Sequence, residues 1–209
     1  MTTSKPAKSI IVYSSPISGH CHRVRLLLSL LGLPHEVVDV DLFSGAHKAP
    51  EFIARNPLGQ IPVIEDGDVT VYDSNAILIY LATRYDDGTW LPRDPVEAAT
   101  VQRWLGLVAG PIAFGPNRAR LASLFKFPVD GDHARQVADG LLANMEKELA
   151  GKAFALGAKP SVADVAAYAY VALAPEGGIS LDAYPAIRAW LGRVEALPGF
   201  VPMQRSSST

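Results

Sequence analysis

The order of the short elements in the first 85 residues constrains the fold more than any other feature of the sequence. Residues 9–13 form a β-branched, apolar run, as expected of a buried parallel strand, and residues 36–42 form a second predicted strand. Residues 19–31 lie between them and repeat leucine and valine at helical spacing, which gives the helix one apolar face. A helix that crosses over between two neighbouring strands implies that the strands run parallel.

A hairpin then adds an antiparallel edge to this sheet. The Asp-Gly pair at 66–67 separates two apolar runs, residues 61–65 and 69–72, and such a pair favours a tight turn between strands. Residues 48–55 before it have the pattern of a short, irregular helix, and residues 74–85 after it form an amphipathic helix. The predicted element order of the first half is therefore β-α-β-α-β-β-α.

The second half of the chain is predicted to be helical. Residues 86–95 are rich in turn residues and form a linker between a domain of residues 1–85 and a domain of residues 96–209. Pro111, Pro116 and Pro128 are expected to interrupt the first long helical stretch. Four or five helices are predicted, over residues 96–109, 117–125, 131–150, 161–172 and 184–196.

Composition excludes several classes of function. A net charge of -2 and the lack of a long basic run argue against a nucleic-acid partner. The longest nearly uncharged apolar stretch, residues 165–174, is too short to span a bilayer, and residues 10–13 are too short for a signal peptide. Cys21 is the single cysteine, which excludes an internal disulfide and a multi-thiolate metal site. We expect a cytoplasmic protein that binds no metal and no membrane.

A proline opens the predicted central strand in the segment Gln60-Ile61-Pro62-Val63. Proline cannot donate to a strand ladder, so its position needs a reason. A cis Ile61-Pro62 bond would turn the backbone of Ile61 outward and offer its N–H and C=O to an extended ligand. The alternative is an ordinary trans proline at the start of a strand.

The pair Asp73-Ser74 stands at the predicted start of the next helix. Ser74 can cap this helix, and the unpaired N–H groups of the first turn attract an anion. A free α-carboxylate fits Ser74 and those amides, while Asp73 can pair with an α-ammonium group. The pair thus fits an α-amino-acid moiety such as a γ-glutamyl group, and a plain helix cap is the alternative.

With a third motif, the chain resembles the cytosolic glutathione transferases over nearly its whole length. Ser161 and Asp164 form an S-x-x-D capping box, which is structural in that family. The proline segment matches the family's cis-proline motif, and Asp73-Ser74 matches its acidic residue-serine pair, with Asp where Glu is commoner. The resemblance implies an α/β thioredoxin-like N-terminal domain plus an all-α C-terminal helical-bundle domain.

The resemblance also implies the reaction and the partners. Glutathione is the co-substrate, bound by Gln60, Ile61, Pro62, Asp73 and Ser74 without a metal, and its thiolate attacks a small apolar electrophile. Family members are usually homodimers that pair the first domain of one subunit with the second domain of the other. Activation of the thiol requires its pKa to fall from about 8.5, which a hydroxyl donor and helix-terminal N–H groups can achieve.

Ser18 is the predicted thiol-activating residue. It lies two residues after Pro16 and directly before the first helix, where the serine-type plant and insect classes of the family (phi-, delta- and theta-like) carry their catalytic serine. Ser14 is the second candidate, since it corresponds to the tyrosine or serine used by other classes. Cys21 stands at the position of a resolving cysteine in thioredoxin-type enzymes, but a buried structural thiol is the preferred interpretation.

Two further sets of residues complete the expected site. His47 and Lys48 have the spacing of the pair that meets the glycyl carboxylate in the plant serine-type class, or they form a solvated pair on a loop. An electrophile pocket is expected between the domains. Its candidate wall residues, which could equally be core, are Trp104, Leu105, Val108, Ile112 and Phe114.

Other functions remain open on the same scaffold. Glutathione-dependent isomerisation, peroxide reduction and dehalogenation are alternatives, although the isomerase class has serine and cysteine where this chain has Gly19 and His20. A non-catalytic protein that binds a partner or a hydrophobic ligand is another, because a fold does not determine a function.

Overall fold

The computed structural model describes residues 5–204 of the chain. These residues divide into two compact units, one of residues 5–91 together with Pro198–Gln204 and one of residues 92–197. Residues 1–4 and 205–209, the outer ends of the two expected domains, lie outside the described part. Each unit is described by itself below.

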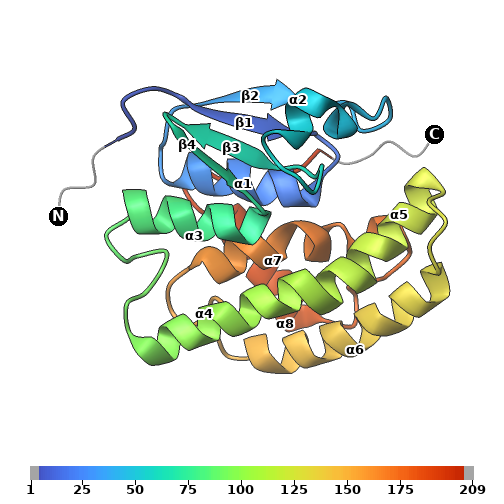
Figure 1. The fold of residues 1–209 in the computed structure, drawn as a ribbon. Coiled ribbons are helices and arrows are strands. Elements are labelled where there is room, and N and C mark those ends of the chain that lie inside the picture. Colours follow the sequence, from blue (N-terminus) through green and yellow to red (C-terminus); the bar gives the residue numbers. More distant parts are fainter. Residues whose placement is uncertain (1–4, 205–209) are drawn as a thin grey trace. The chain divides into compact units, whose positions relative to one another are not determined.

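The first unit contains a four-stranded mixed sheet (Figure 1). Its strands lie in the order β2-β1-β3-β4, with β1 and β2 parallel and with β3 antiparallel to both β1 and β4. The crossover and the hairpin predicted from the sequence are thus confirmed, as is the thioredoxin-like class of this domain. The strands are β1 (Ile10–Ser14), β2 (His35–Asp39), β3 (Val63–Asp66) and β4 (Val69–Tyr72).

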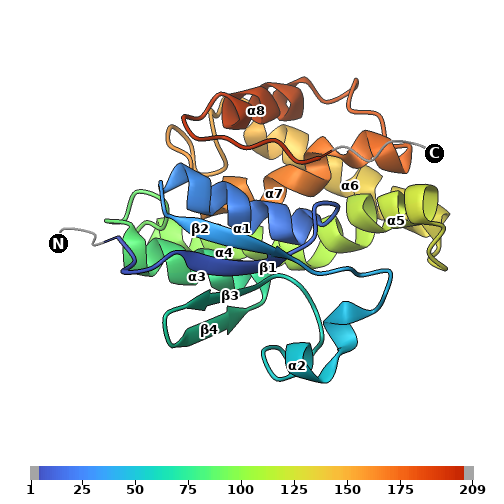
Figure 2. The same cartoon turned by 90° about the horizontal axis from the view of Figure 1, so that it is seen from above.

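Two helices, α1 (Gly19–Leu30) and α3 (Ser74–Tyr85), cover one face of the sheet (Figures 1 and 2). The predicted apolar faces are the buried ones, because leucine, isoleucine and valine recur on each helix at the spacing that aligns side chains on one side. Burial of these side chains supplies most of the free energy that holds the helices on the sheet. The fully buried apolar residues include Ile10 and Val12 of β1, Val24, Leu27 and Leu28 of α1, and Ile77, Leu78 and Leu81 of α3.

The opposite face carries the short helix α2 (Pro50–Ile53), preceded by a 3₁₀ turn over Ala46–Lys48. Phe52 of α2 is buried in a cluster with Val40 and Val63, and its ring meets that of Tyr13 edge-on at 6.1 Å between centroids. The Tyr13 hydroxyl donates to Glu65 at 3.0 Å. These contacts hold the segment around α2 against the sheet.

A carboxylate joins the β3–β4 hairpin to α3. Asp66 is buried, and its Oδ2 accepts hydrogen bonds from Tyr85 at 2.5 Å and from Tyr80 at 2.7 Å. Burial, together with the neighbouring Asp66 charge, raises the pKa of Tyr80. Because both tyrosines lie on α3, this cluster fixes the helix along its axis and with it the position of its first residues.

The segment Pro198–Gln204 groups with the first unit. The sequence assigned all of residues 96–209 to the second domain, and this part of the assignment is corrected. The reason is a pair of hydrogen bonds from α1: His22 Nε2 lies 2.8 Å from the Val201 carbonyl, and Ser29 Oγ donates to the Gly199 carbonyl at 2.7 Å.

The second unit is helical (Figure 1), as predicted. Helix α7 is its core, because every residue from Val162 to Val171 is buried, and it packs against α4 and α8. The helices are α4 (Pro95–Leu107), α5 (Arg118–Phe125), α6 (Gly131–Leu149), α7 (Val162–Ala172) and α8 (Pro185–Glu195), with a 3₁₀ turn over Ala174–Gly177.

Pro111 and Pro116 do not interrupt the first long helical stretch, contrary to the expectation from the sequence. The chain passes from α4 into a π-helical segment, Val108–Asn117, and on into α5 as one continuous rod (Figure 1). Proline removes one backbone donor and crowds the preceding turn. The wider i→i+5 winding accommodates both prolines without ending the helix.

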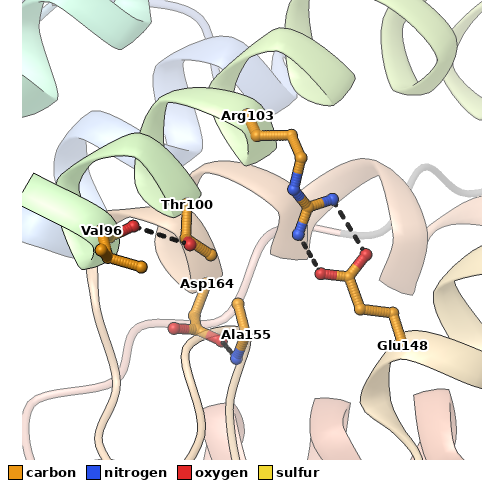
Figure 3. Close-up of polar contacts among 6 residues, drawn as sticks. All are labelled: Val96, Thr100, Arg103, Glu148, Ala155 and Asp164. Atoms are coloured by element: carbon orange, nitrogen blue, oxygen red, sulfur yellow. Dashed lines mark hydrogen bonds and ion pairs between the residues drawn. The ribbon is translucent and has the colours of Figure 1, made fainter.

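Asp164 organises the second unit, and Figure 3 shows one of its contacts, with Ala155. The predicted capping box is confirmed: Ser161 accepts from the backbone of Ala163, and Asp164 accepts from the backbone of Ser161 at 2.9 Å. The second oxygen of Asp164 accepts from the Ala155 backbone at 2.7 Å.

At the surface of the same unit, Arg103 forms an ion pair with Glu148 that joins α4 to α6.

Candidate functional site

The strand register brings the three predicted site segments to one end of the sheet. Tyr13 at the end of β1 pairs with Val63 at the start of β3, and Val63 pairs with Tyr72 at the end of β4. Each of these strand ends adjoins one segment: the loop to Ser18 follows β1, Ile61-Pro62 precedes β3, and Asp73 follows β4.

Ser18 caps the N-terminus of α1. Its backbone is extended, and its Oγ accepts a hydrogen bond from the backbone N–H of Cys21 at 3.3 Å. The hydroxyl is half-buried and keeps its own proton for a further bond, since the cap uses only a lone pair. It also lies at the positive end of the helix, where an anion is stabilised.

Ser14 and Cys21 lie deeper in the first unit. Ser14 is 1% exposed, and its carbonyl accepts the backbone N–H of Val40. Cys21 is buried, as predicted. Its burial raises the pKa of the Cys21 thiol, while hydrogen bonds to Ser18, Ser15 and Ser14 partly oppose this effect. A buried neutral thiol is chemically inert, in line with a structural role.

The Ile61-Pro62 peptide bond is cis, which confirms the prediction made from the motif. Pairing in β3 begins at Val63, so Ile61 lies just outside the ladder. The preceding loop is held by Asn56, which is buried. Its Nδ2 donates to the Gln60 carbonyl at 2.7 Å and its Oδ1 accepts from the Leu58 backbone at 3.0 Å, while the Gln60 side chain stays exposed.

His47 and Lys48 lie in the 3₁₀ turn that packs against this loop. Lys48 Nζ donates to the carbonyls of Leu58 at 3.1 Å and Gly59 at 2.9 Å. Gly59 has a φ of +57°, and a Cβ there would lie 2.9 Å from the His47 carbonyl oxygen. His47 is half-buried, and its Nδ1 has no hydrogen-bond partner among residues 5–204. The turn and the proline loop thus form one packed assembly.

Asp73, not Ser74, is the N-cap of α3, which corrects the expectation that Ser74 caps the helix. Asp73 Oδ1 accepts from the backbone N–H groups of Asn75 at 2.9 Å and Ala76 at 3.0 Å. Its φ is 69°, a left-handed value that is uncommon outside glycine. Such conformations cluster at ligand sites, where the surrounding structure maintains them. Ser74 becomes the first helical residue, and it is buried.

No role was assigned to Arg23 from the sequence, but in the structure it contacts Ser74. It is 1% exposed on α1, and its Nη1 donates to Ser74 Oγ at 3.2 Å and to Asn75 Oδ1 at 3.3 Å. His20 Nδ1 lies 3.4 Å from the same Ser74 oxygen, and burial, assisted by the Arg23 charge, lowers the pKa of His20 to about 3. The available signal was a charged residue one turn before Leu27, on the apolar face of the helix.

The candidate electrophile residues belong to the second unit. Trp104, Leu105, Val108 and Ile112 are buried. The Nε1 of Trp104 has no hydrogen-bond partner within the described residues. Phe114 is 48% exposed, and the guanidinium of Arg118 lies 4.4 Å from its ring centroid. The set comprises Trp104, Leu105, Val108, Ile112 and Phe114.

Across residues 5–204, no group of three or more His, Cys, Asp and Glu side chains is arranged to hold a metal ion. Over the same residues, no helix combines the length and the apolar character needed to cross a bilayer.

A thioredoxin-like domain with a cis proline and a helical second unit defines a class of glutathione-binding proteins, and comparison with known proteins supports this assignment. Residues 17–84 match the model of the glutathione S-transferase N-terminal domain, and residues 129–198 match that of the C-terminal domain. Glutathione S-transferase 3 of Zea mays is 35% identical over 204 residues, which cover 90% of each chain. The chain therefore belongs to the glutathione S-transferase family.

Further comparisons confirm the predicted family and fold and show the range of its activities. The crystal structure of a glutathione S-transferase from Pseudomonas fluorescens Pf-5 matches with a TM-score of 0.88 and 35% identity, over 95% of this chain and 100% of that one. A maleylacetoacetate isomerase of Rhizobium meliloti is 32% identical over 202 residues, 93% of this chain and 95% of that protein. These relatives support a glutathione-dependent enzyme activity.

Proposed function

We propose that this protein is a glutathione transferase that binds glutathione at the end of the sheet and activates its thiol with Ser18. The register of Tyr13, Val63 and Tyr72 supports this more than any other observation, because it gathers the thiol-activating and peptide-binding segments at one place. Holding and activating a nucleophile in this way relies on positioning and electrostatics.

The γ-glutamyl end would bind at the N-terminus of α3. Its α-carboxylate would accept from the hydroxyl and the backbone N–H of Ser74, because Asp73 Oδ1 already accepts the next two amides. Its α-ammonium would pair with the other carboxylate oxygen, Asp73 Oδ2. The cysteinyl backbone would pair with Ile61 beside Pro62. The unusual φ of Asp73 supports this assignment.

The glycyl end would approach the turn of His47 and Lys48, with Gln60 beside it. Lys48 Nζ carries three protons, and two carbonyls of the proline loop take two of them. One proton is left for the glycyl carboxylate. His47 Nδ1 is buried without a hydrogen-bond partner in the described chain, and a carboxylate oxygen could satisfy it when it carries the proton.

Ser18 would stabilise the thiolate. Its oxygen already accepts the Cys21 amide, so its proton can be donated to the sulfur anion, whose own proton passes to solvent water. The sulfur then forms a bond to the electrophilic carbon, and the displaced electron pair leaves with the leaving group. The half-buried state of Ser18, compared with 1% exposure for Ser14, supports Ser18 as the activating residue.

The second substrate would be a small apolar electrophile. Phe114, the exposed member of the candidate set, is the ring that such a substrate could contact directly, and its buried neighbours would shape the surroundings. A cytoplasmic homodimer, as is usual in the family, is part of the same proposal.

A second candidate function is isomerisation of maleylacetoacetate. It is favoured by relatives of that name, one of them 32% identical over 93% of this chain. In such a reaction the glutathione sulfur would add to the double bond, rotation would follow, and the sulfur would leave again, so that glutathione is not consumed. Incubation with maleylacetoacetate and catalytic glutathione separates the two candidates by whether a conjugate accumulates.

A calorimetric titration with glutathione tests the proposal, together with ultraviolet difference spectra for bound thiolate at pH 7. S-methylglutathione is the matched control, because it presents the same peptide without a free thiol. Saturable binding of both, with a thiolate band for glutathione alone, is expected. No binding at millimolar glutathione would exclude both enzyme candidates and leave a partner-binding or ligand-carrying protein.

A further inference from the structure

Arg23 is a buried cation beneath the first turn of α3. It lies on α1, is 1% exposed, and reaches the neighbouring helix with one nitrogen, Nη1, which donates to Ser74 Oγ at 3.2 Å and to Asn75 Oδ1 at 3.3 Å. Burying a guanidinium costs free energy that hydrogen bonds to neutral acceptors only partly offset. A hydrophobic residue in this position of an otherwise apolar helix face would serve folding as well or better.

The contact with Arg23 controls the Ser74 hydroxyl. A hydroxyl has one proton and two lone pairs, and Arg23 occupies one lone pair. His20 Nδ1 lies 3.4 Å from the same oxygen and competes for the remaining positions. If Nδ1 carries the proton, His20 fills the second lone pair and the Ser74 proton is free for a ligand. If Nδ1 is bare, Ser74 donates to His20 instead.

The Arg23 charge also acts on the helix terminus itself. Backbone N–H groups at the start of α3 already attract an anion, and the two acceptors of Arg23 belong to the first two helical residues. In a buried, low-dielectric setting a full positive charge adds to that field much more than it would in water. An anion bound there would in turn favour the Nδ1-protonated form of His20, because that form releases the Ser74 proton.

We infer that Arg23 is a positioning residue of the glutathione site: it orients the Ser74 hydroxyl toward the α-carboxylate of the γ-glutamyl group and strengthens the positive field that holds this carboxylate. His20 acts with Arg23, because its tautomer decides whether the Ser74 hydroxyl donates its proton to His20 or to the ligand. The inference rests on the proposed function, which assigns the α-carboxylate to Ser74. It adds a specificity-determining residue that touches no ligand atom and acts through Ser74.

The decisive test compares two ligands that differ in one group. Glutathione and its analogue with the γ-glutamyl α-carboxylate replaced by a carboxamide are titrated calorimetrically against the wild type, Arg23→Met, Arg23→Lys, Ser74→Ala and the double variant Arg23→Met/Ser74→Ala. Arg25→Met is the matched control. Arg25 lies two residues further along α1, which places it on a different face, and its Nε has no hydrogen-bond partner in residues 5–204.

The expected pattern is specific to the carboxylate. Arg23→Met weakens glutathione binding about tenfold and leaves binding of the carboxamide within about twofold. Arg23→Lys recovers part of the loss, because the charge stays while the forked donor geometry is lost. Arg25→Met binds both ligands as the wild type does. The double variant binds glutathione no more weakly than whichever single variant loses more affinity, since the two residues act as a unit. In conjugation assays the KM for glutathione rises in Arg23→Met while kcat changes little.

Three results would overturn the inference. In the first, Arg23→Met binds both ligands like the wild type; in the second, it loses the same factor for both; in the third, its loss of affinity adds to that of Ser74→Ala. Where Arg23→Met does not fold, as judged by circular dichroism and thermal unfolding, Arg23→Lys decides: an unchanged ratio of the two affinities rejects the role. Failure of the wild type to bind glutathione at all is a different outcome, which rejects the proposed function and the inference together.

Discussion

The carboxylate of Asp164 accepts the indole N–H of Trp190 at 2.8 Å, so that one side chain joins the start of α7 to the middle of α8. The same carboxylate accepts the backbone of Ala155 and both the backbone and the hydroxyl of Ser161. Asp164 is 0% exposed. Four donors converge on one anion that water does not reach, and this makes Asp164 the main polar anchor of the second unit.

Replacement Asp164→Ala should therefore destabilise the protein by about 3 kcal/mol or more, because it leaves several buried donors unsatisfied. Urea unfolding monitored by circular dichroism measures the change. Asp94→Ala is the matched control: Asp94 caps α4 through two backbone N–H groups at the surface, and its loss should cost only about 1 kcal/mol. Equal losses in the two variants would contradict the anchoring role.

Gly59 tests the packing of the His47–Lys48 turn against the proline loop. A Cβ at Gly59 would lie 2.9 Å from the His47 carbonyl, Ile53 Cδ1 and Lys48 Cδ, so Gly59→Ala should displace the turn. Gly67 is the matched control, because it has a similar φ of +60° but open space around the added methyl group. Gly67→Ala should cost about 1 kcal/mol for its backbone conformation alone, and Gly59→Ala about 1–3 kcal/mol more for overpacking.

Glutathione affinity gives the second readout of this pair. If the turn holds the glycyl carboxylate, Gly59→Ala should weaken binding several-fold in calorimetric titration while Gly67→Ala leaves it unchanged. Unchanged binding in both variants, with Gly59→Ala still destabilised, would separate the turn from the ligand site.

Much of the fold was predictable because its signals are local. The crossover helix and the Asp-Gly turn dictated the strand directions, and the Gln60-Ile61-Pro62 segment indicated the cis bond. The capping box of Ser161 was readable from the spacing of two residues. In each case the physical requirement is met within a few positions of the sequence.

Features that depend on contacts across the sequence were not predictable. Arg23 meets Ser74 only after α1 and α3 pack side by side, and nothing local to either helix indicates the other. The continuous rod through Pro111 depends on a π-helical winding that proline patterns do not encode. Asp73 became the cap in place of Ser74 because it adopts a left-handed φ, which sequence alone does not assign to aspartate.

Low pH should destabilise the folded protein because His22 becomes protonated. Burial lowers the pKa of His22 to about 4, with the Val201 carbonyl opposing and the charges of Arg25 and Arg23 adding to the effect. In the unfolded chain the His22 imidazole is protonated below about pH 6.5, whereas in the folded protein it is protonated only near pH 4. The contribution of neutral His22 to the free energy of unfolding is therefore fully present above about pH 6.5 and is lost as the pH drops toward about 4. The loss amounts to about 2 kcal/mol at pH 5.

Urea midpoints at pH 7.5 and pH 5.0 measure this loss in the wild type and in His22→Gln. Glutamine can still donate to the Val201 carbonyl but does not titrate. The difference between the two pH values should shrink in the variant. The remainder reflects groups such as His20, whose pKa burial also lowers. An equal difference in both proteins would mean that His22 does not carry the effect.

Ser18→Ala should abolish the thiolate band of bound glutathione at pH 7 and reduce kcat for conjugation about 100-fold, the typical effect of removing one donor to a developing anion. Binding should persist within a few-fold, because the peptide contacts lie elsewhere. The cap of α1 is lost as well, at a cost of about 1 kcal/mol. Spectra recorded against pH give the pKa of the bound thiol, which should rise toward its value in free glutathione.

Two further variants separate activation from capping. Ser18→Asp restores a good N-cap acceptor for the Cys21 amide but places no proton donor at the sulfur, so stability should return while the thiolate band stays absent. Ser14→Ala should keep the band, because Ser14 is buried below the proposed site. Loss of the band in Ser14→Ala together with its survival in Ser18→Ala would assign thiol activation to Ser14 instead.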